Sequence, residues 1–518
     1  MAIKQVTTEG LEWTGRPFGG FIDDVKRRLP HYGSDFKDGL NTKTLGTTIF
    51  LFFAALANAI AFGALTGVLT GNQIGVIEML IVTAAGGIFF ALFSGQPLTI
   101  LGGTGPITIF TGLLYVTCTQ MEISFLATYG WVGIWSGIIL LILAFTDASA
   151  LMGYFTRFTD EIFAALISVI FIVEAIKDIL LAFGTEGYGL LSAFFSLILA
   201  IGTFFLARFL RNSTNTPYLR HTLREFLADF GPSIAILSMT LLAMIYVEIP
   251  VSKPVVPSTL GTTSGRDWLV PLFDVPLWVI FGSIIPAILA TILLFLDQNI
   301  TTRLVNSKDN KLKKGMGYHL DLAIVGLIVL GGSFFALPWI VAATVHSLNH
   351  VRSQAFVKVE DIGGTKKEKI VSVQETRLSG LFVHVLIAVS LLFLGYFAMI
   401  PMAVLFGLFL YMGVASLAGN QFFERMTLWV TDPKLYPDTH YLKTVPPKIV
   451  HRFTLIQFVC FMILWVLKTS AIGILFPLMI AALVPIRYYS SKLFHSKHVD
   501  ALLVEDEEED EKMWSEIG

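Results

Sequence analysis

The sequence predicts an all-α polytopic membrane protein in which fourteen membrane segments form two inverted repeats of seven. Of its 518 residues, 54% are hydrophobic and 14% are charged, whereas roughly a quarter of the residues of a soluble domain are charged. The hydrophobic residues gather in runs near the roughly 20 residues that a helix needs to cross a bilayer. Two runs, 105–118 and 342–352, are too short to span, and each is the third of its half. This recurrence indicates a transporter built from inverted repeats.

Charges and Gly/Pro clusters separate the segments. The first repeat, 43–249, holds segments 43–69, 75–94, 105–118, 127–148, 160–183, 188–210 and 230–249. The second repeat, 276–487, holds segments 276–304, 320–336, 342–352, 378–397, 401–418, 452–468 and 470–487. Outside the repeats we expect a cytosolic lead-in with an amphipathic segment (1–42), an extracellular loop (250–275) and an acidic cytosolic tail (488–518).

The basic residues indicate the orientation. With fourteen crossings, the clusters within 26–28, 208–224, 303–314, 366–369 and 443–452 all fall on one face. Basic loops are retained on the cytoplasmic side of a membrane. We therefore expect a multi-pass protein of the plasma or cell membrane, with both termini in the cytoplasm.

Composition excludes several function classes. Thirty-six Lys and Arg against 38 Asp and Glu give a net charge of −2, which excludes nucleic acid held by bulk charge. The two cysteines, Cys118 and Cys460, lie far apart and lack a second ligand at metal-binding spacing, which argues against disulfide frameworks, zinc sites and haem attachment. No nucleophile, metal or nucleotide constellation is visible, so we expect neither an enzyme nor a resident cofactor.

Each short segment follows a proline and an extended stretch, Pro97 in the first half and Pro338 in the second. A half-helix that starts inside the membrane leaves its first N–H groups unpaired and directs its positive dipole end into the gap. Two such ends favour an anion. The expected anion-binding residues, all at these starts, are Thr104, Gly105, Ala343, Thr344, Val345 and His346. A packed Gly/Pro kink is the alternative for a single broken segment, but a symmetric pair favours a site.

Asp297 is the candidate cation ligand, because it ends a run with no other charge back to Asp274. Thr301 lies four residues on, on the same helical face, and could complete an oxygen site for Na⁺. Spacing alone leaves an alternative. Asp297 lies roughly 30 Å along a helix from Pro276, where an acid could reach the membrane surface.

Two further ionisable residues are ambiguous. His346 could add a pH-dependent charge to the anion site, or it could be a hydrogen-bonded structural residue. Glu174 lies near an outer helix end, where Lys177 or Asp178 could pair with it, and we interpret it as an entrance or structural residue.

Several stretches resemble the membrane domain of the bicarbonate transporter family, which includes anion exchangers and sodium-bicarbonate cotransporters. They lie between Phe18 and Leu493, and the clearest are Phe18-Gly19-Gly20, Gly95-Gln96-Pro97-Leu98, Phe155-Thr156-Arg157-Phe158-Thr159-Asp160-Glu161, Gly317-Tyr318-His319-Leu320-Asp321-Leu322 and Leu410-Tyr411-Met412-Gly413-Val414-Ala415-Ser416-Leu417.

The resemblance implies an elevator-like motion and a homodimer. A core domain of segments 1–4 and 8–11 would slide against a gate domain of segments 5–7 and 12–14, and the dimer would form through the gate domains. It also implies a central site at Thr104, Gly105, Thr344 and Val345 with Asp297 and Thr301, lined by Asn58, Gln96 and Thr99. Lys468 matches an outward-facing lysine of the family and is expected at the entrance with Glu174.

We therefore expect a secondary active transporter of HCO₃⁻ or CO₃²⁻ involved in pH regulation, coupled to Na⁺ bound at Asp297 and Thr301. Sodium coupling is favoured because the similar anion exchangers usually carry Glu where Asp297 stands. His346 occupies the position of an arginine in anion exchangers and of an aliphatic residue in the cotransporters. The alternatives are therefore Na⁺-independent Cl⁻/HCO₃⁻ exchange or borate transport, and more distantly an anion channel.

The acidic run 505–511 resembles a motif proposed to recruit carbonic anhydrase, although such runs are usually solvated and disordered.

Overall fold

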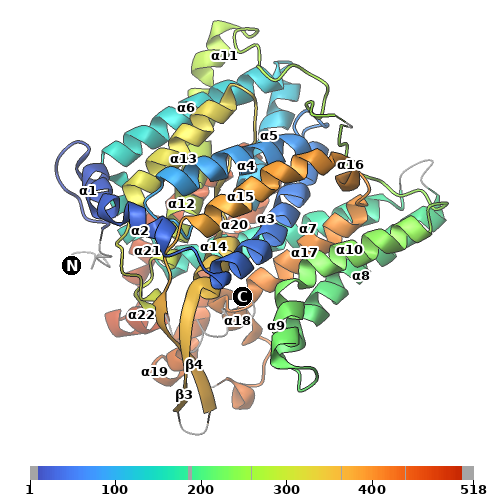
Figure 1. Cartoon of the computed structure of the whole chain (residues 1–518). Helices are drawn as coiled ribbons and strands as arrows, with labels where there is room; N and C mark the ends of the chain where they lie inside the picture. Colours follow the sequence, from blue (N-terminus) through green and yellow to red (C-terminus); the bar gives the residue numbers. More distant parts are fainter. Residues whose placement is uncertain (1–9, 185–188, 258, 363–364, 438, 504–518) are drawn as a thin grey trace. The chain divides into compact units, whose positions relative to one another are not determined.

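The computed structural model describes residues 10–184, 189–257, 259–362, 365–437 and 439–503 (Figure 1). The chain divides into two compact units. The large unit comprises 7–152 and 179–408, and the small unit comprises 1–6, 153–178 and 409–518. All the segments expected in the core domain lie in the large unit, together with segments 6 and 7. The division into core and gate domains stays a prediction.

The large unit holds most of the long apolar helices. They are α3 (Thr42–Leu69), α4 (Val76–Phe93), α6 (Phe125–Phe145), α8 (Leu190–Arg211), α12 (Ile284–Val305) and α15 (Leu378–Ser390). Within the described residues, eight spans are long and apolar enough to cross a membrane, or ten if two bent pairs each count as one. One bent pair is α9 (His221–Asp229) with α10 (Gly231–Ile245), at 68°. The polytopic helical fold is confirmed, and the count of fourteen stays a prediction.

Both short segments are half-helices preceded by extended chain, as the sequence predicted. The first, α5, covers Gly105–Gln120, and the second, α14, covers Thr344–Gln354. Their leading strands, β1 (Leu101–Gly102) and β2 (Val341–Ala342), pair antiparallel, with Leu101 opposite Ala342. The second half-helix starts two residues later than expected because residues 341–342 belong to this strand pair. The two half-helices are thus joined through their leading strands.

Small residues allow α6 to pack closely along α13 (Tyr318–Ser333). A Cβ on Gly137 would lie 2.9 Å from the carbonyl oxygen of Gly326, so a larger residue there would force the helices apart. Close approach at small residues is a common way for helices to associate in membranes. The same unit contains α15 packed against α4 and α3.

The lead-in, in which the sequence predicts an amphipathic segment, contains α1 (Gly19–Arg28) and α2 (Tyr32–Lys37). Helix α1 contacts α6 and α13 of the large unit. The structure also adds an element that the sequence analysis did not predict. A hairpin of β3 (Ala355–Ile362) and β4 (Thr365–Val373) follows α14 and extends away from the helices (Figure 1). The fold is therefore mostly rather than entirely α-helical.

The small unit is built from α7 (Arg157–Leu181), the end of α17 (Met402–Leu417), α18 (Gln421–Thr427), α20 (Pro447–Thr469), α21 (Phe476–Ser491) and α22 (Ser496–Leu503). Its interior contains a charged cluster. The fully buried Arg425 donates from Nη2 to Glu161 Oε2 at 2.7 Å and to Gln457 Oε1 at 2.9 Å. These partners compensate the charge of a guanidinium that would otherwise be costly to bury.

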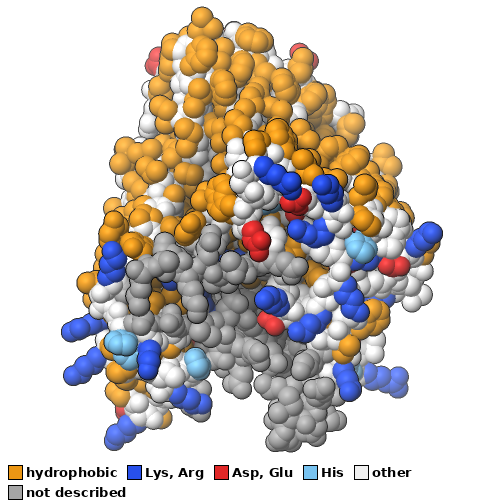
Figure 2. All heavy atoms as spheres, turned by 90° about the vertical axis from the view of Figure 1, so that its left-hand side faces the viewer, with side chains coloured by type: hydrophobic (Ala, Val, Ile, Leu, Met, Phe, Trp, Pro, Cys, Tyr) orange, Lys and Arg blue, Asp and Glu red, His pale blue; other side chains and the backbone are white. Residues whose placement is uncertain are grey.

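The surface fits a membrane protein. Hydrophobic side chains cover the upper part of the face in Figure 2, and most Lys and Arg side chains lie in its lower part. Membrane proteins show this separation of apolar and charged surface, since ionisable groups are costly in hydrocarbon.

Candidate functional site

Asp297 lies beside the start of the first half-helix. Thr104, which precedes α5, donates from its hydroxyl to Asp297 Oδ2 at 2.7 Å. Asp297 itself is only 8% exposed. The surface-acid interpretation is therefore wrong. Residues Leu277–Val305 form one apolar span, in which α11 (Leu277–Gly282) is followed directly by α12. The carboxylate is buried because the start of α5 lies against it.

Thr301 lies at the start of the second half-helix. Its hydroxyl is 2.6 Å from that of Thr344, the first residue of α14, and 3.2 Å from the carbonyl oxygen of Ala342. The predicted helical face is confirmed: α12 presents Asp297 to α5 and, one turn later, Thr301 to α14. The two half-helices and α12 thus bring a carboxylate and three threonine hydroxyls together.

The half-helix starts provide unpaired amide groups. In α5 the first intrahelical bond is donated by Thr108, and in α14 by Ser347. The N–H groups of the helix residues before Thr108 and Ser347 have no acceptor within their helix. Pro106 is one of these residues and has no N–H group to donate. Ala343 does not fit its expected role as an amide donor, because its N–H already donates to Ile100 O at 2.8 Å in the strand ladder.

The remaining expected residues of α14 follow its first position. Val345 is 39% exposed, and His346, the third residue, is half-buried. Both belong to the first turn, whose amide groups and positive dipole end attract anions. His346 also contacts the backbone of Ala54 on α3. Both expected roles of His346, at the anion site and as a hydrogen-bonded structural residue, stay predictions.

Gln298 is a site residue that the sequence analysis did not single out. Its side-chain oxygen accepts from Ala342 N at 2.9 Å, so it holds β2 beside α12. Asn58 on α3 lies beside β1, as Gln298 lies beside β2. A Cβ added to Gly102 would lie 3.1 Å from Asn58 Oδ1. The signal for Gln298 was its place next to Asp297, in a run of three polar residues, 297–299, within an apolar helix.

Gln96 and Thr99 lie in the extended stretch before α5. Gln96 donates from Nε2 to Asn306 Oδ1 at 2.7 Å, and its backbone N–H donates to Asp321 Oδ1 at 3.1 Å. Thr99 is buried, and its hydroxyl has no hydrogen-bond partner within the described ranges. Gln96 therefore holds the stretch in place.

Glu174 and Lys468 form an ion pair in the small unit. Lys468 Nζ lies 2.6 Å from Glu174 Oε1, and Lys177 Nζ lies 3.4 Å from Oε2 of the same carboxylate. The suggested pairing with Lys177 is confirmed, and the shorter contact with Lys468 is new. A role of this pair at an entrance stays a prediction.

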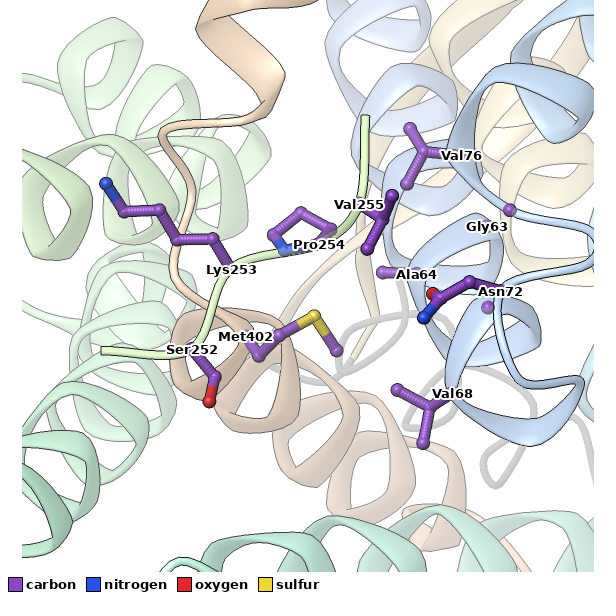
Figure 3. Close-up of a pocket in the computed structure, with 12 residues that line it drawn as sticks. Gly63, Ala64, Val68, Asn72, Val76, Ser252, Lys253, Pro254, Val255 and Met402 are labelled. Carbon is purple, nitrogen blue, oxygen red and sulfur yellow. The ribbon is translucent and has the colours of Figure 1, made fainter. Parts of the chain in front are cut away.

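A separate pocket of about 190 Å³ lies at the far end of α3 (Figure 3). Val68 and Asn72 line one side, and Ser252, Pro254 and Met402 line the other, while the ammonium group of Lys253 points away. The starts of α5 and α14 do not line it, so it is not the candidate site.

Two expectations concern metals and partners. Among the described residues, no group of three or more His, Cys, Asp or Glu could hold a metal ion. A Na⁺ site at Asp297 and Thr301 would instead use one carboxylate with hydroxyl and carbonyl oxygens. The acidic run 505–511 lies outside the described residues.

The family model for the HCO₃⁻ transporter integral membrane domain matches residues 16–189 and 187–508. The chain belongs to the bicarbonate transporter family. It is 38% identical to the electrogenic sodium bicarbonate cotransporter 1 of Sus scrofa, over 95% of this chain and 52% of the relative. It is 37% identical to the anion exchange protein 3 of Danio rerio, over 99% of this chain and 46% of the relative. Members of this family are membrane transporters, not enzymes.

The chain spans about half the length of these relatives. Among solved structures, it is similar to murine Slc26a9 in the inward-facing state, with a TM-score of 0.61 and 13% identity over 95% of this chain and 74% of the other. It is also similar to the transmembrane domain of the cyanobacterial bicarbonate transporter BicA, with a TM-score of 0.57 and 16% identity over 82% and 98%. At these low identities, the two similarities support the fold of this chain alone.

Proposed function

We propose that this chain is a secondary active transporter that couples HCO₃⁻ or CO₃²⁻ movement to Na⁺. The observation that carries the proposal is the contact between Asp297 and Thr104, with Thr301 against Thr344 one turn along α12. This arrangement combines a negative side chain with two positive helix ends, so a cation and an anion can bind as neighbours.

The anion binds between the starts of α5 and α14, where unpaired N–H groups and the hydroxyl of Thr344 donate to its oxygens. Sodium binds to Asp297 and Thr301. Because opposite charges attract strongly where water is scarce, each ion raises the affinity for the other. Thr104 donates its hydroxyl hydrogen to Asp297 and directly precedes α5, so it lies between the two proposed ion positions.

Transport proceeds by elevator-like alternating access. The core domain, segments 1–4 and 8–11, carries the site past a gate domain of segments 5–7 and 12–14, and a homodimer forms through the gate domains. The paired half-helices support this proposal, since inverted-repeat transporters bind substrate at such breaks. The basic clusters support a plasma-membrane orientation with both termini in the cytoplasm.

Na⁺-independent exchange of Cl⁻ or borate for bicarbonate is the second candidate. Two observations favour it: the similarity to an anion exchange protein, and His346 in the first turn of α14. Protonated His346 would supply the positive charge that Na⁺ supplies in the first proposal. Exchange would then strengthen at acidic pH.

Proteoliposomes loaded with a pH indicator test the proposal. Bicarbonate-dependent alkalinisation is measured with an inward Na⁺ gradient or an outward Cl⁻ gradient, for wild type, Asp297→Asn and the exposed control Asp274→Asn. We expect flux that requires Na⁺ and is lost only in Asp297→Asn. Flux that follows Cl⁻ and ignores Na⁺ would reject sodium coupling and support exchange.

A further inference from the structure

Asp35, on the N-terminal helix α2, is a fully buried carboxylate surrounded by basic side chains. Its Oδ2 lies 3.0 Å from Arg28 Nη2 and 3.1 Å from Arg377 Nε, and its Oδ1 lies 3.0 Å from Lys314 Nζ. Arg28 and Arg377 are each only 2% exposed. Buried ion pairs are favourable only when their geometry is close to ideal, so these contacts fix the position of α2.

Arg377 connects this cluster to the end of α4. It donates from Nη1 to Ala91 O at 2.9 Å and from Nη2 to Ser94 O at 2.7 Å. The last carbonyls of a helix lack intrahelical donors and form the negative end of its dipole. Arg377 satisfies them while its Nε binds Asp35, so one guanidinium joins α2 to the last turn of α4.

The extended chain toward the candidate site begins at that turn. Gly95 and Gln96 donate their N–H groups to Asp321 Oδ1 at 2.6 and 3.1 Å. Residues 96–100 then lead to β1, and the stretch ends at Thr104 beside Asp297. The segment that carries the start of α5 is therefore fixed at its beginning by Arg377 and Asp321.

The neighbouring helix α1 makes corresponding contacts. Gly20 N donates to Asp147 Oδ1 at 2.8 Å, after the end of α6, and Asp24 Oδ2 accepts from His319 N at 2.8 Å, at the start of α13. Together α1 and α2 contact the ends of α6 and α13 and the start of α15, and they are joined to the end of α4 through Arg377. These are segments 2, 4, 9 and 11 of the predicted core domain.

We propose that Asp35 and Arg377 are positioning residues for the substrate site, which act through the end of α4 and segment 94–104 on the start of α5. The N-terminal helices then belong to the body that carries the anion, rather than to a separate lead-in. The proposal rests on the proposed transport function. It assigns to α2 a role in substrate affinity although α2 does not touch the substrate.

Arg377→Lys is the principal variant, because a lysine keeps the charge beside Asp35 but cannot donate to Asp35 and two separate carbonyls in a planar fork. Thr376→Val is a second variant, since it removes the 2.8 Å bond from Thr376 Oγ1 to Asp35 O without changing charge. Asp38→Asn is the matched control. Asp38 also contacts Lys314, at 2.8 Å, but its side chain is 49% exposed.

Two measurements on the full chain in proteoliposomes test the proposal. The first measurement compares the change in the KM for bicarbonate with the change in the maximal rate per folded molecule. The second is the deuterium uptake of the backbone amides of residues 94–104, with α10 as the internal reference. In Arg377→Lys we expect KM to rise about tenfold, with a smaller change in maximal rate, as when a supporting partner of a site is lost. Uptake in 94–104 should rise while α10 is unchanged, and Thr376→Val should show the same changes to a lesser degree.

Wild-type KM and uptake in a folded Arg377→Lys would overturn the proposal, as would equal changes in Asp38→Asn. A lower maximal rate with unchanged KM would show a role in stability or in the conformational step, and would overturn it too. If the wild type moves no bicarbonate, the proposed function fails, and uptake in 94–104 still decides whether Arg377 holds this segment.

Discussion

Asp297 and Asp35 are both buried carboxylates of the large unit, but their partners differ. Asp35 lies within 3.1 Å of three basic side chains. Across the described ranges, the hydrogen-bond partner of the Asp297 carboxylate is the hydroxyl of Thr104. The charge of Asp35 is therefore compensated within the protein, whereas that of Asp297 is available to an external cation. Burial marks both residues, and only the partners separate structural support from ion binding.

Removing each charge should have opposite effects on stability. Asp35→Asn leaves buried basic groups without their anion, and we expect it to lower the free energy of unfolding by about 3–5 kcal/mol. Asp297→Asn removes a buried charge that lacks a cationic partner, so stability without Na⁺ should stay the same or rise. Thermal unfolding in detergent, with and without Na⁺, measures both. Equal destabilisation by the two variants would contradict the comparison.

Asp24 is an intermediate case. It accepts from two backbone N–H groups and pairs with Arg27 at 3.2 Å, but burial outweighs these contacts and raises the pKa of Asp24 from 3.8 to about 7. The folded protein therefore holds a proton there that the unfolded chain releases near pH 4. It follows that this group's contribution to stability falls as pH rises from about 4 to 7, and stays low above that range.

Unfolding midpoints measured at intervals from pH 4 to 8 check this prediction for Asp24. In Asp24→Asn the fall in stability between pH 4 and 7 should be smaller by the share that Asp24 contributes, because the amide does not titrate. If the unfolding midpoint of the wild type rises with pH over this range, and rises equally in Asp24→Asn, the predicted fall in stability is contradicted.

Thr301→Val tests the cation side of the site. Its hydroxyl contacts Thr344 and Ala342 O, and the expected Na⁺ site uses the same oxygen. We expect a loss of about 1–2 kcal/mol in Na⁺ affinity, or roughly a tenfold rise in the Na⁺ concentration for half-maximal flux. Thr291→Val is the control, because Thr291 is a buried threonine of the same helix whose hydroxyl has no hydrogen-bond partner among the described residues. An unchanged Na⁺ dependence in Thr301→Val would place the cation elsewhere.

Gly102→Ala should have the smallest effect. A Cβ there would lie 3.1 Å from Asn58 Oδ1, so Asn58 or β1 must shift by a few tenths of an ångström. We expect a loss of stability of about 1 kcal/mol, which Asn58→Ala in the same chain should reduce. Unfolding midpoints of the single and double variants measure the coupling. Additive effects would mean that Asn58 does not hold β1.

The sequence predicted the half-helices and the shared face of Asp297 and Thr301, because prolines, small residues and i, i+4 spacing are local signals. The partners of these residues depend on contacts between distant segments. The side chain of Gln298 binds β2, and that of Arg377 binds the last carbonyl groups of α4. The sequence next to each residue does not indicate these distant partners. The same holds for the burial of Asp297, which depends on the start of α5, a segment far away in the sequence.

The pairing of β1 with β2 also constrains how the protein is made. Leu101 emerges from the ribosome long before its partner Ala342, roughly 10 to 50 s earlier at usual rates of synthesis. For most of that interval the first half-helix has neither its strand partner nor α12 beside it, and contacts so distant in sequence form slowly. The nascent first repeat must therefore remain in the membrane with an incomplete site, and it is during this interval that assistance from a membrane chaperone would matter most.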